Sequence, residues 1–305
     1  MLPSTPQDAG SADATTDLAA DPKVCCVIVN WNGWRDTLEC LASLRQQDYG
    51  SLQVIVVDNG STNDSVERIR AGFPEVQVIA AGENLGFAKG TNVGLRAGLA
   101  GGADFLWLLN NDTVCPPDTL RKLVRKAQQV PEAGLVGSVL YYMHDPARVQ
   151  AWGGGAVKPW IGYTTHFTTP HQLNTNTFTT FASALARRAM LEEVGLLYEG
   201  SFMYYEDSDF CLRMQRTRWK IAIAEDTAIL HKEGGSVPKG ENPFMTQVIT
   251  VSGLRFIRRN SRLAWLGMPV FVALRIGRRV IKGERRGVAA VLRGAMQFLR
   301  EPMPS

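Results

Sequence analysis

The sequence is poor in cysteine, and its few cysteines form no metal-binding or disulfide pattern. The five cysteines are Cys25, Cys26, Cys40, Cys115 and Cys211. Their number is odd, most of them lie in apolar or helical patterns, and none forms a CxxC pair. This usage favours reduced, buried thiols in a cytoplasmic protein over a disulfide framework or a zinc site.

The chain also lacks a secretory signal and an apolar segment long enough to span a bilayer. Residues 1–22 have neither a basic start nor an apolar core, so we read them as a disordered leader. The apolar stretch "LAWLGMPVFVAL" has about a dozen residues, whereas a spanning helix needs roughly 20. No internal repeat is present.

Two common nucleotide-binding fingerprints are absent as well. Neither GxGxxG nor GxxxxGK(S/T) occurs, so the usual dinucleotide-binding and P-loop motifs do not apply. A nucleotide can still be held by carboxylates and amides at strand ends, with a divalent cation neutralising its diphosphate.

Composition indicates a globular chain with an uneven distribution of charge. With 305 residues and 45% hydrophobic content, it can bury the core of one large domain, or of one domain with an appended subdomain. From Arg255 to the end there are 12 Lys/Arg against 2 Asp/Glu, so the first 254 residues hold 21 against 27. The basic character therefore belongs to the C-terminal region.

Strand-like and helix-like stretches alternate through the first 140 residues. The apolar runs "KVCCVIVN", "LQVIVV", "VQVIAA" and "DFLWLL" read as buried parallel strands with helices between them, and "PPDTLRKLVRKAQQ" reads as a helix with Pro at its start. This alternation predicts an open α/β sheet with right-handed crossovers. After about residue 140 we expect loops and short strands over a site, and then a strand and helix in "SALARRAMLEEVGLL".

Polar residues stand where three of these strands end, and ligands of such sheets bind beyond the carboxyl ends of the strands. Asp58 is a candidate for hydrogen bonds to a base or ribose, or else a turn aspartate supporting "DNGS". Asp112 is a candidate ligand for Mg²⁺ or Mn²⁺, or else a helix cap before "PPDTL". The full set is Asn30, Asn32, Asp58, Asn59, Asn110, Asn111 and Asp112.

An acidic cluster, Glu206, Asp207 and Asp209, occurs in "YYEDSDFCLR". Because like charges so close are costly to ionise together, one can act as a general base with a shifted pKa. The alternative is the acidic first turn of a helix, and we assign the chemistry to Asp207 and helix capping or orientation to Asp209. His231, which ends the apolar run "AILH", is either structural or a metal or phosphate contact.

The C-terminal region from Pro243 onward reads as helical and basic. Arginines around its apolar stretch suit a helix that lies on an anionic membrane surface. The alternative is a helical subdomain packed on the core with a solvated basic face.

Taken in order, these motifs resemble glycosyltransferase family 2, which has the GT-A fold, and most closely its rhamnosyltransferase-like branch. The resemblance implies a GT-A domain with a Rossmann-like mixed sheet in residues 23–242, which follows the leader of residues 1–22, and a C-terminal helical extension in 243–305, for which contact with a membrane is one of the two alternatives above. The matching segments run from about residue 24 to 236: "VIVNWNG", "VIVVDNGST", "ENLGFAKGTNVGL", "LLNNDT", "ALARRAMLEEVGLL", "MYYEDSDFCLRMQRTRWKI" and "ILHKEGGS".

The resemblance also implies roles for individual residues. Asp207 would be the catalytic base, with Glu206 as the second choice. Asp112 would bind the Mg²⁺ or Mn²⁺ that bridges the diphosphate, and His231 would be a second metal or diphosphate contact. The implied nucleotide contacts and pocket residues are Asn30, Asn32, Asp58, Asn84, Gly86, Phe87, Gly90, Asn92 and Asn111.

The implied reaction is an inverting, single-displacement transfer of a sugar from a nucleotide-diphosphate sugar to an acceptor hydroxyl that Asp207 deprotonates. The branch suggests dTDP-rhamnose as donor, with a UDP-hexose or UDP-N-acetylhexosamine as the alternative. A glycan or lipid-linked acceptor of bacterial cell-surface polysaccharide synthesis would place the enzyme in the cytoplasm, peripheral at the inner face of the membrane. No nucleic-acid partner is predicted.

Two positions depart from the family pattern. In "NND" an amide replaces the first carboxylate of a DxD motif, which leaves one strong metal ligand. Tyr198 stands where relatives usually carry Asp, and Glu199 is the candidate substitute.

Two other functions are alternatives to a glycosyltransferase. A nucleotidyltransferase usually has a Gly-rich, basic loop after its first strand, and "VNWNGWRD" does not supply one. A non-catalytic, membrane-bound scaffold of the same fold would retain its function without Asp112 and Asp207, but the chain keeps these acidic positions.

Overall fold

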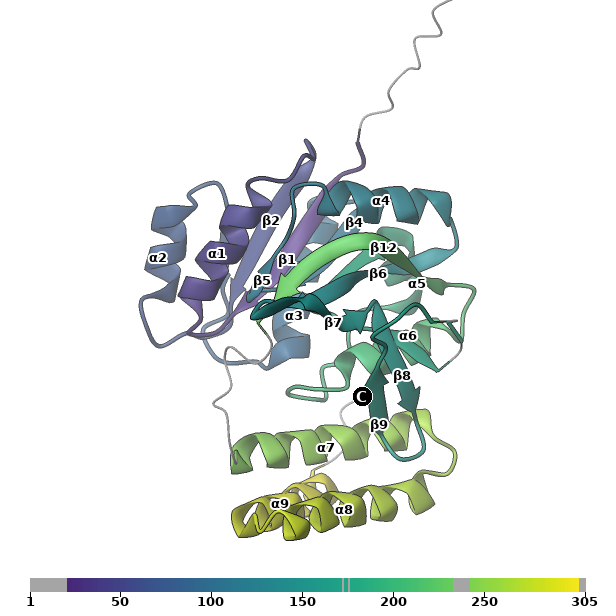
Figure 1. Ribbon diagram of the computed structural model, residues 1–305. Helices are drawn as coiled ribbons and strands as arrows, with labels where there is room; N and C mark the ends of the chain where they lie inside the picture. The colour runs from purple at the N-terminus through teal and green to yellow at the C-terminus, as the bar shows by residue number, and fades with distance from the viewer. Residues whose placement is uncertain (1–20, 172, 175, 233–241, 302–305) are drawn as a thin grey trace, which may run out of the picture.

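A computed structural model describes residues 21–171, 173–174, 176–232 and 242–301 and is built around a mixed sheet of nine strands (Figure 1). The strand order is β3-β2-β1-β4-β11-β6-β12-β5, with β7 paired to β6. The strands are β1 (Val24–Asn30), β2 (Leu52–Asp58), β3 (Gln77–Ala80), β4 (Phe105–Asn110), β5 (Thr113–Val114), β6 (Ala133–Tyr142), β7 (Asp145–Trp152), β11 (Ser183–Arg187) and β12 (Lys220–His231).

The parallel half of the sheet is the alternating region of the sequence, and the α/β prediction is confirmed there. β1 pairs in parallel with both β2 and β4, and its last residue, Asn30, is in register with Asp58. Six of the seven side chains of β1 are buried, as expected for a strand covered on both faces. The connecting helices are α1 (Trp34–Leu44), α2 (Ser65–Gly72) and α3 (Phe87–Ala100).

Two hydrophobic layers cover the sheet. The helices α1, α2 and α4 (Thr119–Gln129) pack on one face, and α3, α5 (Arg188–Val194) and α6 (Glu206–Met214) pack on the other. The helix α4 begins two residues after Pro117, so the prolines lead into this helix and do not open it as the sequence suggested. All five cysteines are buried free thiols, as predicted.

The second half of the sheet is antiparallel at β11 and returns to parallel pairing between β6 and β12. Short strands were expected after residue 140, and a small second sheet, β10-β8-β9, is found there. Its strands are β8 (Gly154–Lys158), β9 (Tyr163–His166) and β10 (Thr177–Thr179). The sequence did not predict β6 as a long strand, although eight of its ten residues are buried.

The C-terminal region forms a layer of three helices below the sheet domain (Figure 1). They are α7 (Pro243–Asn260), α8 (Ala264–Ile281) and α9 (Arg285–Arg300), and they share one hydrophobic core with α3, α5 and α6. Within the described residues no helix has the length and apolarity needed to cross a membrane. Of the predicted leader, residues 1–20 lie outside the described part, while the carbonyl of Pro22 accepts a hydrogen bond from the Tyr49 hydroxyl (2.7 Å).

Candidate active site

The ends of β1 and β2 hold a buried network around one carboxylate. Asn30 Nδ2 donates to Asp58 Oδ1 (2.8 Å), and the Ser61 hydroxyl donates to the same oxygen (2.6 Å). Asn30 is fully buried, and its Oδ1 accepts from the Thr37 hydroxyl (2.9 Å). The Asn30 amide therefore holds the Asp58 carboxylate in place. The N–H of Ser61 donates to Asp58 Oδ2 (3.0 Å), so Asp58 also supports the turn after β2.

The loops after these two strands are tied to each other. Asn32 adopts a left-handed backbone (φ 56°), and its Oδ1 accepts from the N–H of Thr62 (2.8 Å). Its own N–H donates to Ser61 Oγ (2.8 Å). A non-glycine residue in this region is uncommon, and Asn tolerates it best, which accounts for the amide at this position.

Asn59 was noted at a strand end but given no role, and the structure makes it a bridge to the next loop. Its Nδ2 donates to Asn84 Oδ1 and to the carbonyl of Gly86 (both 3.1 Å), and its Oδ1 accepts from the N–H of Leu85 (3.1 Å). A Cβ at Gly90 would lie 3.2 Å from the Asn59 side chain, so Gly90 permits this close approach. In the sequence, only the polar run "DNGS" indicated a role for Asn59.

The glycine at the start of α3 places that helix against the loop preceding α6. Gly86 has a φ of +80°, and a Cβ there would lie 2.2 Å from the carbonyl oxygen of Phe202. The N–H of Phe87 donates to the same carbonyl (2.7 Å). Further along α3, Asn92 Nδ2 donates to the carbonyl of Leu197 and to the Glu199 carboxylate (both 2.8 Å), and its Oδ1 accepts from the N–H of Leu197. Asn84, Gly86 and Phe87 thus lie beside the strand ends, whereas the Asn92 side chain is committed to the segment 197–199.

The "NND" motif begins with the last residue of β4 and continues into the turn before β5. Asn111 Nδ2 donates to the Thr37 hydroxyl (3.0 Å), so this amide anchors the first βα loop. Asp112 is mostly buried, and its Oδ1 lies 3.2 Å from Nε2 of His231 at the end of β12. The other ring nitrogen of His231, Nδ1, lies 2.7 Å from Gln150 Oε1 on β7. The Gln150 amide oxygen accepts from Nδ1, which orients the ring with Nε2 toward Asp112.

These residues fit a divalent cation with few protein ligands. The described residues contain no group of three or more His, Cys, Asp or Glu arranged to hold a metal. Asp112 and His231 offer one carboxylate and one imidazole, and Mg²⁺ commonly binds through one or two carboxylates plus substrate phosphates and waters. Mn²⁺ accepts the same oxygen donors together with imidazole.

The acidic cluster begins α6 behind two strained residues. Tyr204 and Tyr205 both have left-handed backbones (φ 73° and 69°), which is rare for aromatic residues and is typical of functional sites. Burial and the neighbouring Asp207 raise the pKa of Glu206 from 4.5 to about 8. Burial also raises the pKa of Asp207 above its usual value of 3.8, and hydrogen bonds from the N–H (2.6 Å) and hydroxyl (3.1 Å) of Ser208 oppose that rise.

The two carboxyls are therefore not equivalent. Glu206 Oε2 is buried and has no hydrogen-bond partner among the described residues, which favours the protonated form. Asp207 accepts two hydrogen bonds, which favour the ionised form. Asp209 is outside this pair: its Oδ1 accepts from Asn260 Nδ2 (2.7 Å) and Arg259 Nε (3.2 Å), so it ties α6 to α7.

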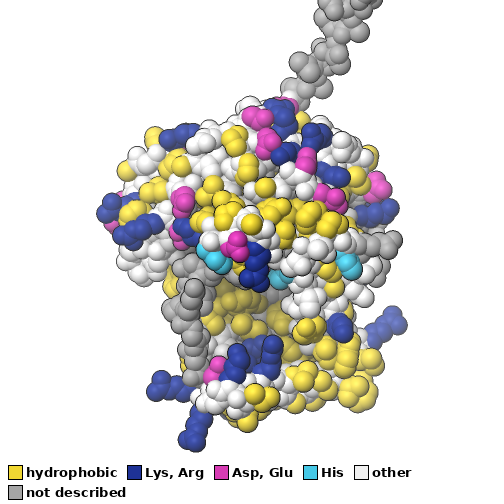
Figure 2. Space-filling view, viewed as in Figure 1, with side chains coloured by type: hydrophobic (Ala, Val, Ile, Leu, Met, Phe, Trp, Pro, Cys, Tyr) yellow, Lys and Arg dark blue, Asp and Glu magenta, His cyan; other side chains and the backbone are white. Residues whose placement is uncertain are grey.

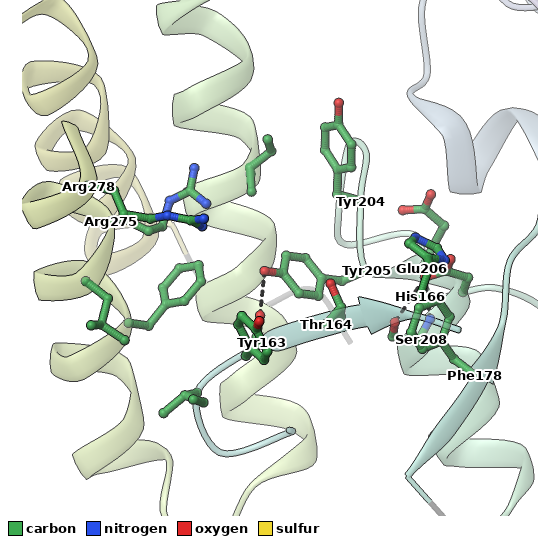
Figure 3. A pocket seen from close by; sticks show the side chains of 16 residues that line it. Tyr163, Thr164, His166, Phe178, Tyr204, Tyr205, Glu206, Ser208, Arg275 and Arg278 are labelled. Carbon is green, nitrogen blue, oxygen red and sulfur yellow. Dashed lines mark hydrogen bonds between the residues drawn. The ribbon is translucent and has the colours of Figure 1, made fainter. Parts of the chain in front are cut away.

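Sequence reasoning missed His166, which lies on β9 and interacts electrostatically with Asp207. Both residues line a cavity of about 630 Å³ between the small sheet and the C-terminal helices (Figure 3). None of the residues assigned to the nucleotide or the metal lines this cavity. The structure thus presents two adjoining regions, one at the strand ends and one at the start of α6.

The comparisons with known proteins agree on the family and the fold. A family model described as "Glycosyl transferase family 2" matches residues 25–195. A mannosyltransferase from Pyrobaculum calidifontis, solved with GDP-Man and Mn²⁺, has the same fold, with a TM-score of 0.57 at 19% identity over 94% of this chain and 84% of that one. S. aureus TarS gives a TM-score of 0.56 at 13% identity over 90% and 91%. The predicted GT-A fold with a helical C-terminal part is confirmed.

The curated relatives carry more than one activity in their names. An N-acetylglucosaminyltransferase of Bradyrhizobium elkanii is 36% identical over 119 residues, 37% of this chain and 63% of that protein. An N-acetylglucosaminyl-diphospho-decaprenol L-rhamnosyltransferase of Mycobacterium tuberculosis is 26% identical over 67% of this chain and 73% of that protein. The chain spans less than two thirds of the Bradyrhizobium enzyme and 31% of a Mesorhizobium japonicum relative. Since the family model covers more than half of its length, the chain belongs to glycosyl transferase family 2.

Proposed function

We propose that this protein is an inverting glycosyltransferase that moves a sugar from a nucleotide-diphosphate sugar to a hydroxyl of a glycan or glycolipid acceptor in bacterial cell-surface polysaccharide synthesis. The observation that carries this function is the unequal Glu206–Asp207 pair at the edge of a cavity large enough for an acceptor. An inverting displacement needs one base and no covalent nucleophile, and one ionised carboxyl supplies it.

In this mechanism Asp207 accepts the proton of the acceptor hydroxyl as that oxygen attacks the anomeric carbon. Glu206 stays protonated near neutral pH, so the pair carries one negative charge. Ser208 holds the Asp207 carboxylate in position through its N–H and hydroxyl. The loop between α5 and α6 contacts α3 at Gly86 and Phe87, and this contact would hold the start of α6 near the residues proposed to bind the donor.

On the donor side, Asp58 would bind the base or ribose, with Asn30, Ser61 and Asn32 holding its loop. Asp112 and His231 would hold Mg²⁺ or Mn²⁺, which supplies electrostatic stabilisation of the departing diphosphate when bound. The Mn²⁺ named in the Pyrobaculum calidifontis structure supports a divalent cation for this fold.

Rhamnose from dTDP-rhamnose is the first choice of donor. It is supported by the Mycobacterium tuberculosis relative and by a dTDP-rhamnosyl transferase RfbF of Shigella flexneri, 24% identical over 69% of each chain. The N-acetylglucosaminyltransferases among the relatives make UDP-N-acetylglucosamine the second choice.

The C-terminal helices would bring the enzyme to the inner face of the cytoplasmic membrane as a peripheral protein. Large apolar side chains are exposed on α8 and α9, and Figure 2 shows basic side chains around the helical layer. An anionic membrane surface matches both features. The most exposed of these apolar residues are Trp265, Leu274, Val280, Ile281 and Leu299.

The test is a donor screen with purified protein, Mg²⁺ or Mn²⁺ and dTDP-rhamnose, UDP-N-acetylglucosamine, UDP-galactose and UDP-glucose, following release of nucleoside diphosphate. We expect turnover of one donor that falls about 10²- to 10⁴-fold in Asp207→Asn, the usual contribution of a general base. Asp118→Asn, an exposed residue before α4, is the matched control. A donor turned over equally by the wild type and Asp207→Asn would refute the assigned base, and binding of none of the donors would favour the scaffold.

A further inference from the structure

The cavity beside the acidic pair has two chemically different ends. Figure 3 shows Glu206 and His166 at one end and Arg275 and Arg278 at the other, with Tyr205 between them. Apolar side chains form much of the remaining wall: Ile161, Phe178, Ile249, Phe271 and Leu274. A ligand that fills this space must offer a group to the carboxylates, an apolar portion, and an anion to the arginines.

The arginine end carries positive charge without a matching carboxylate. Arg275 is half-buried, and burial together with the charges of Arg279 and Arg278 lowers its pKa from 12.5 to about 10. Its Nε donates to the hydroxyl of Thr250 (3.2 Å) and its Nη2 reaches the carbonyl of Thr246 (3.4 Å), both on α7. Across the described parts of the chain, none of these three arginines forms an ion pair with Asp or Glu.

Arg275 and Arg279 are partly buried and Arg278 is exposed, so two of these guanidinium groups have lost part of their water while all three repel one another. Arg279 adds to the cost, since its Nε is buried without a hydrogen-bond partner in the described structure. An anionic ligand would remove this penalty, and guanidinium groups bind phosphate oxygens with paired hydrogen bonds.

The two ends belong to one continuous site. Tyr205 interacts electrostatically with both Arg275 and Asp207. Its hydroxyl donates a hydrogen bond to the carbonyl of Gly162 (2.8 Å), which holds the ring between the two ends. On α8, the residues Phe271, Leu274, Arg275 and Arg278 are spaced three or four apart and so face the cavity together. Other residues of α8, including Trp265 and Val272, line an apolar groove shared with α9.

We infer that this cavity is the acceptor site and that Arg275 and Arg278 bind the phosphate or diphosphate of a lipid-linked acceptor, whose hydroxyl reaches Asp207 while its apolar portion contacts the apolar wall of the cavity. This assignment rests on the proposed transferase function. The donor's own diphosphate is a poor match for these arginines, because no residue assigned to the donor lines the cavity.

The test measures binding directly, with the full chain and with EDTA present to exclude metal-held diphosphate. Equilibrium dialysis with labelled farnesyl diphosphate compares the wild type with Arg275→Gln, Arg278→Gln and the matched control Arg293→Gln, an exposed arginine of α9 away from the cavity. We expect each cavity variant to weaken binding roughly tenfold or more, since hydrogen bonds to charged groups contribute this much. Arg275→Lys should recover part of it, and Arg293→Gln should match the wild type.

Competition identifies the source of the anion. Farnesol should compete poorly if the phosphate is recognised, and inorganic pyrophosphate should compete poorly if the lipid chain also contributes. Pyrophosphate that competes as well as farnesyl diphosphate would overturn the lipid-linked acceptor, and so would a preference for phosphatidylglycerol vesicles. Unchanged binding in both Arg275→Gln and Arg278→Gln would overturn the subsite.

Donor hydrolysis without acceptor, assayed on the same preparations with Mg²⁺, distinguishes failure of the arginine subsite from failure of the proposed transferase function. Normal nucleoside diphosphate release together with arginine-independent binding would refute the subsite alone. Arginine-dependent binding in a protein that neither binds nor turns over any donor would refute the transferase function and leave the anion site standing.

Discussion

His231 Nε2 lies 3.2 Å from Asp112 Oδ1, although the two residues are far apart in the sequence. The antiparallel pairing of β5 with β12 creates this proximity, because His231 is in register with Thr113 and the N–H of Lys232 donates to the Asp112 carbonyl (3.0 Å). At this distance the two side chains either share a proton in a hydrogen bond or bind one cation together.

Removal of either side chain decides between these roles. We expect Asp112→Ala to abolish and His231→Ala to weaken Mn²⁺ binding measured by titration calorimetry, because each removes one of two protein ligands. Asp118→Ala removes an exposed carboxylate and should bind Mn²⁺ like the wild type. If the wild type binds no Mn²⁺ with nucleoside diphosphate present, the two residues are a structural pair only.

Gln150 supports the same site from β7. Its Oε1 fixes the His231 ring through Nδ1 (2.7 Å), and groups that orient a metal-binding histidine typically contribute a factor of about 10–100 in metal affinity. Gln150→Leu, which has a similar volume and no acceptor, should therefore weaken Mn²⁺ binding by about that factor. Gln150→Glu keeps the acceptor oxygens and should retain affinity. Equal affinities in the wild type and Gln150→Leu would contradict this role.

The positions of the residues proposed to bind the donor were more predictable than those of their surroundings. Asn30, Asp58 and Asp112 end buried apolar runs, and parallel strands bring such ends to one edge of a sheet, so local pattern and topology sufficed. Gln150 and His166 were not predictable in this way, because they lie on β7 and β9, strands with many exposed residues and no clear alternation. Their partners are set by long-range pairing that one sequence does not reveal.

Two of the residues that the sequence singled out also have partners within the protein. The amides of Asn92 and Asn111 donate to Leu197 and Thr37, and their contact with a nucleotide stays a prediction. Amides at strand ends serve backbone and ligand equally well, so residue type alone cannot separate the two roles. The arginines of α8 read from the sequence as a basic face, on a membrane surface or in solvent. The sequence does not show that α8, α7 and β9 together line a cavity, and this arrangement is what gives the arginines a possible ligand.

The raised pKa of Glu206 predicts a specific dependence of stability on pH. Its carboxyl has an ordinary pKa of 4.5 when unfolded and about 8 when folded, so between these values the folded state holds a proton that the unfolded state has released. Stability therefore falls as pH rises through this window. We expect Glu206→Gln to flatten this fall, measured as the free energy of unfolding from urea titrations across the same pH range.

The exposed Glu67 of α2 provides the matched control for this titration. Glu67→Gln should preserve the wild-type slope, because it removes an exposed carboxyl and leaves the Glu206–Asp207 pair intact. A Glu206→Gln protein with the same pH slope as the wild type would show that Glu206 is ionised in the folded protein, and Glu206 would then compete with Asp207 for the role of base.

The apolar groove between α8 and α9 predicts membrane contact that depends on two exposed residues. Trp265 and Leu299 line this groove with exposures of 72% and 80%, and transfer of such side chains into the membrane interface is favourable. The double variant Trp265→Ser/Leu299→Ser should float poorly with phosphatidylglycerol vesicles at low salt. Phe244→Ser, which removes an exposed aromatic ring of α7 outside the groove, should float like the wild type.

Because arginines supply the attraction to anionic lipid, binding of the wild type should decline as salt is added and as phosphatidylcholine replaces phosphatidylglycerol. Equal flotation of all three proteins would show that the groove does not touch lipid, and the helical layer would then be only a packed extension of the core.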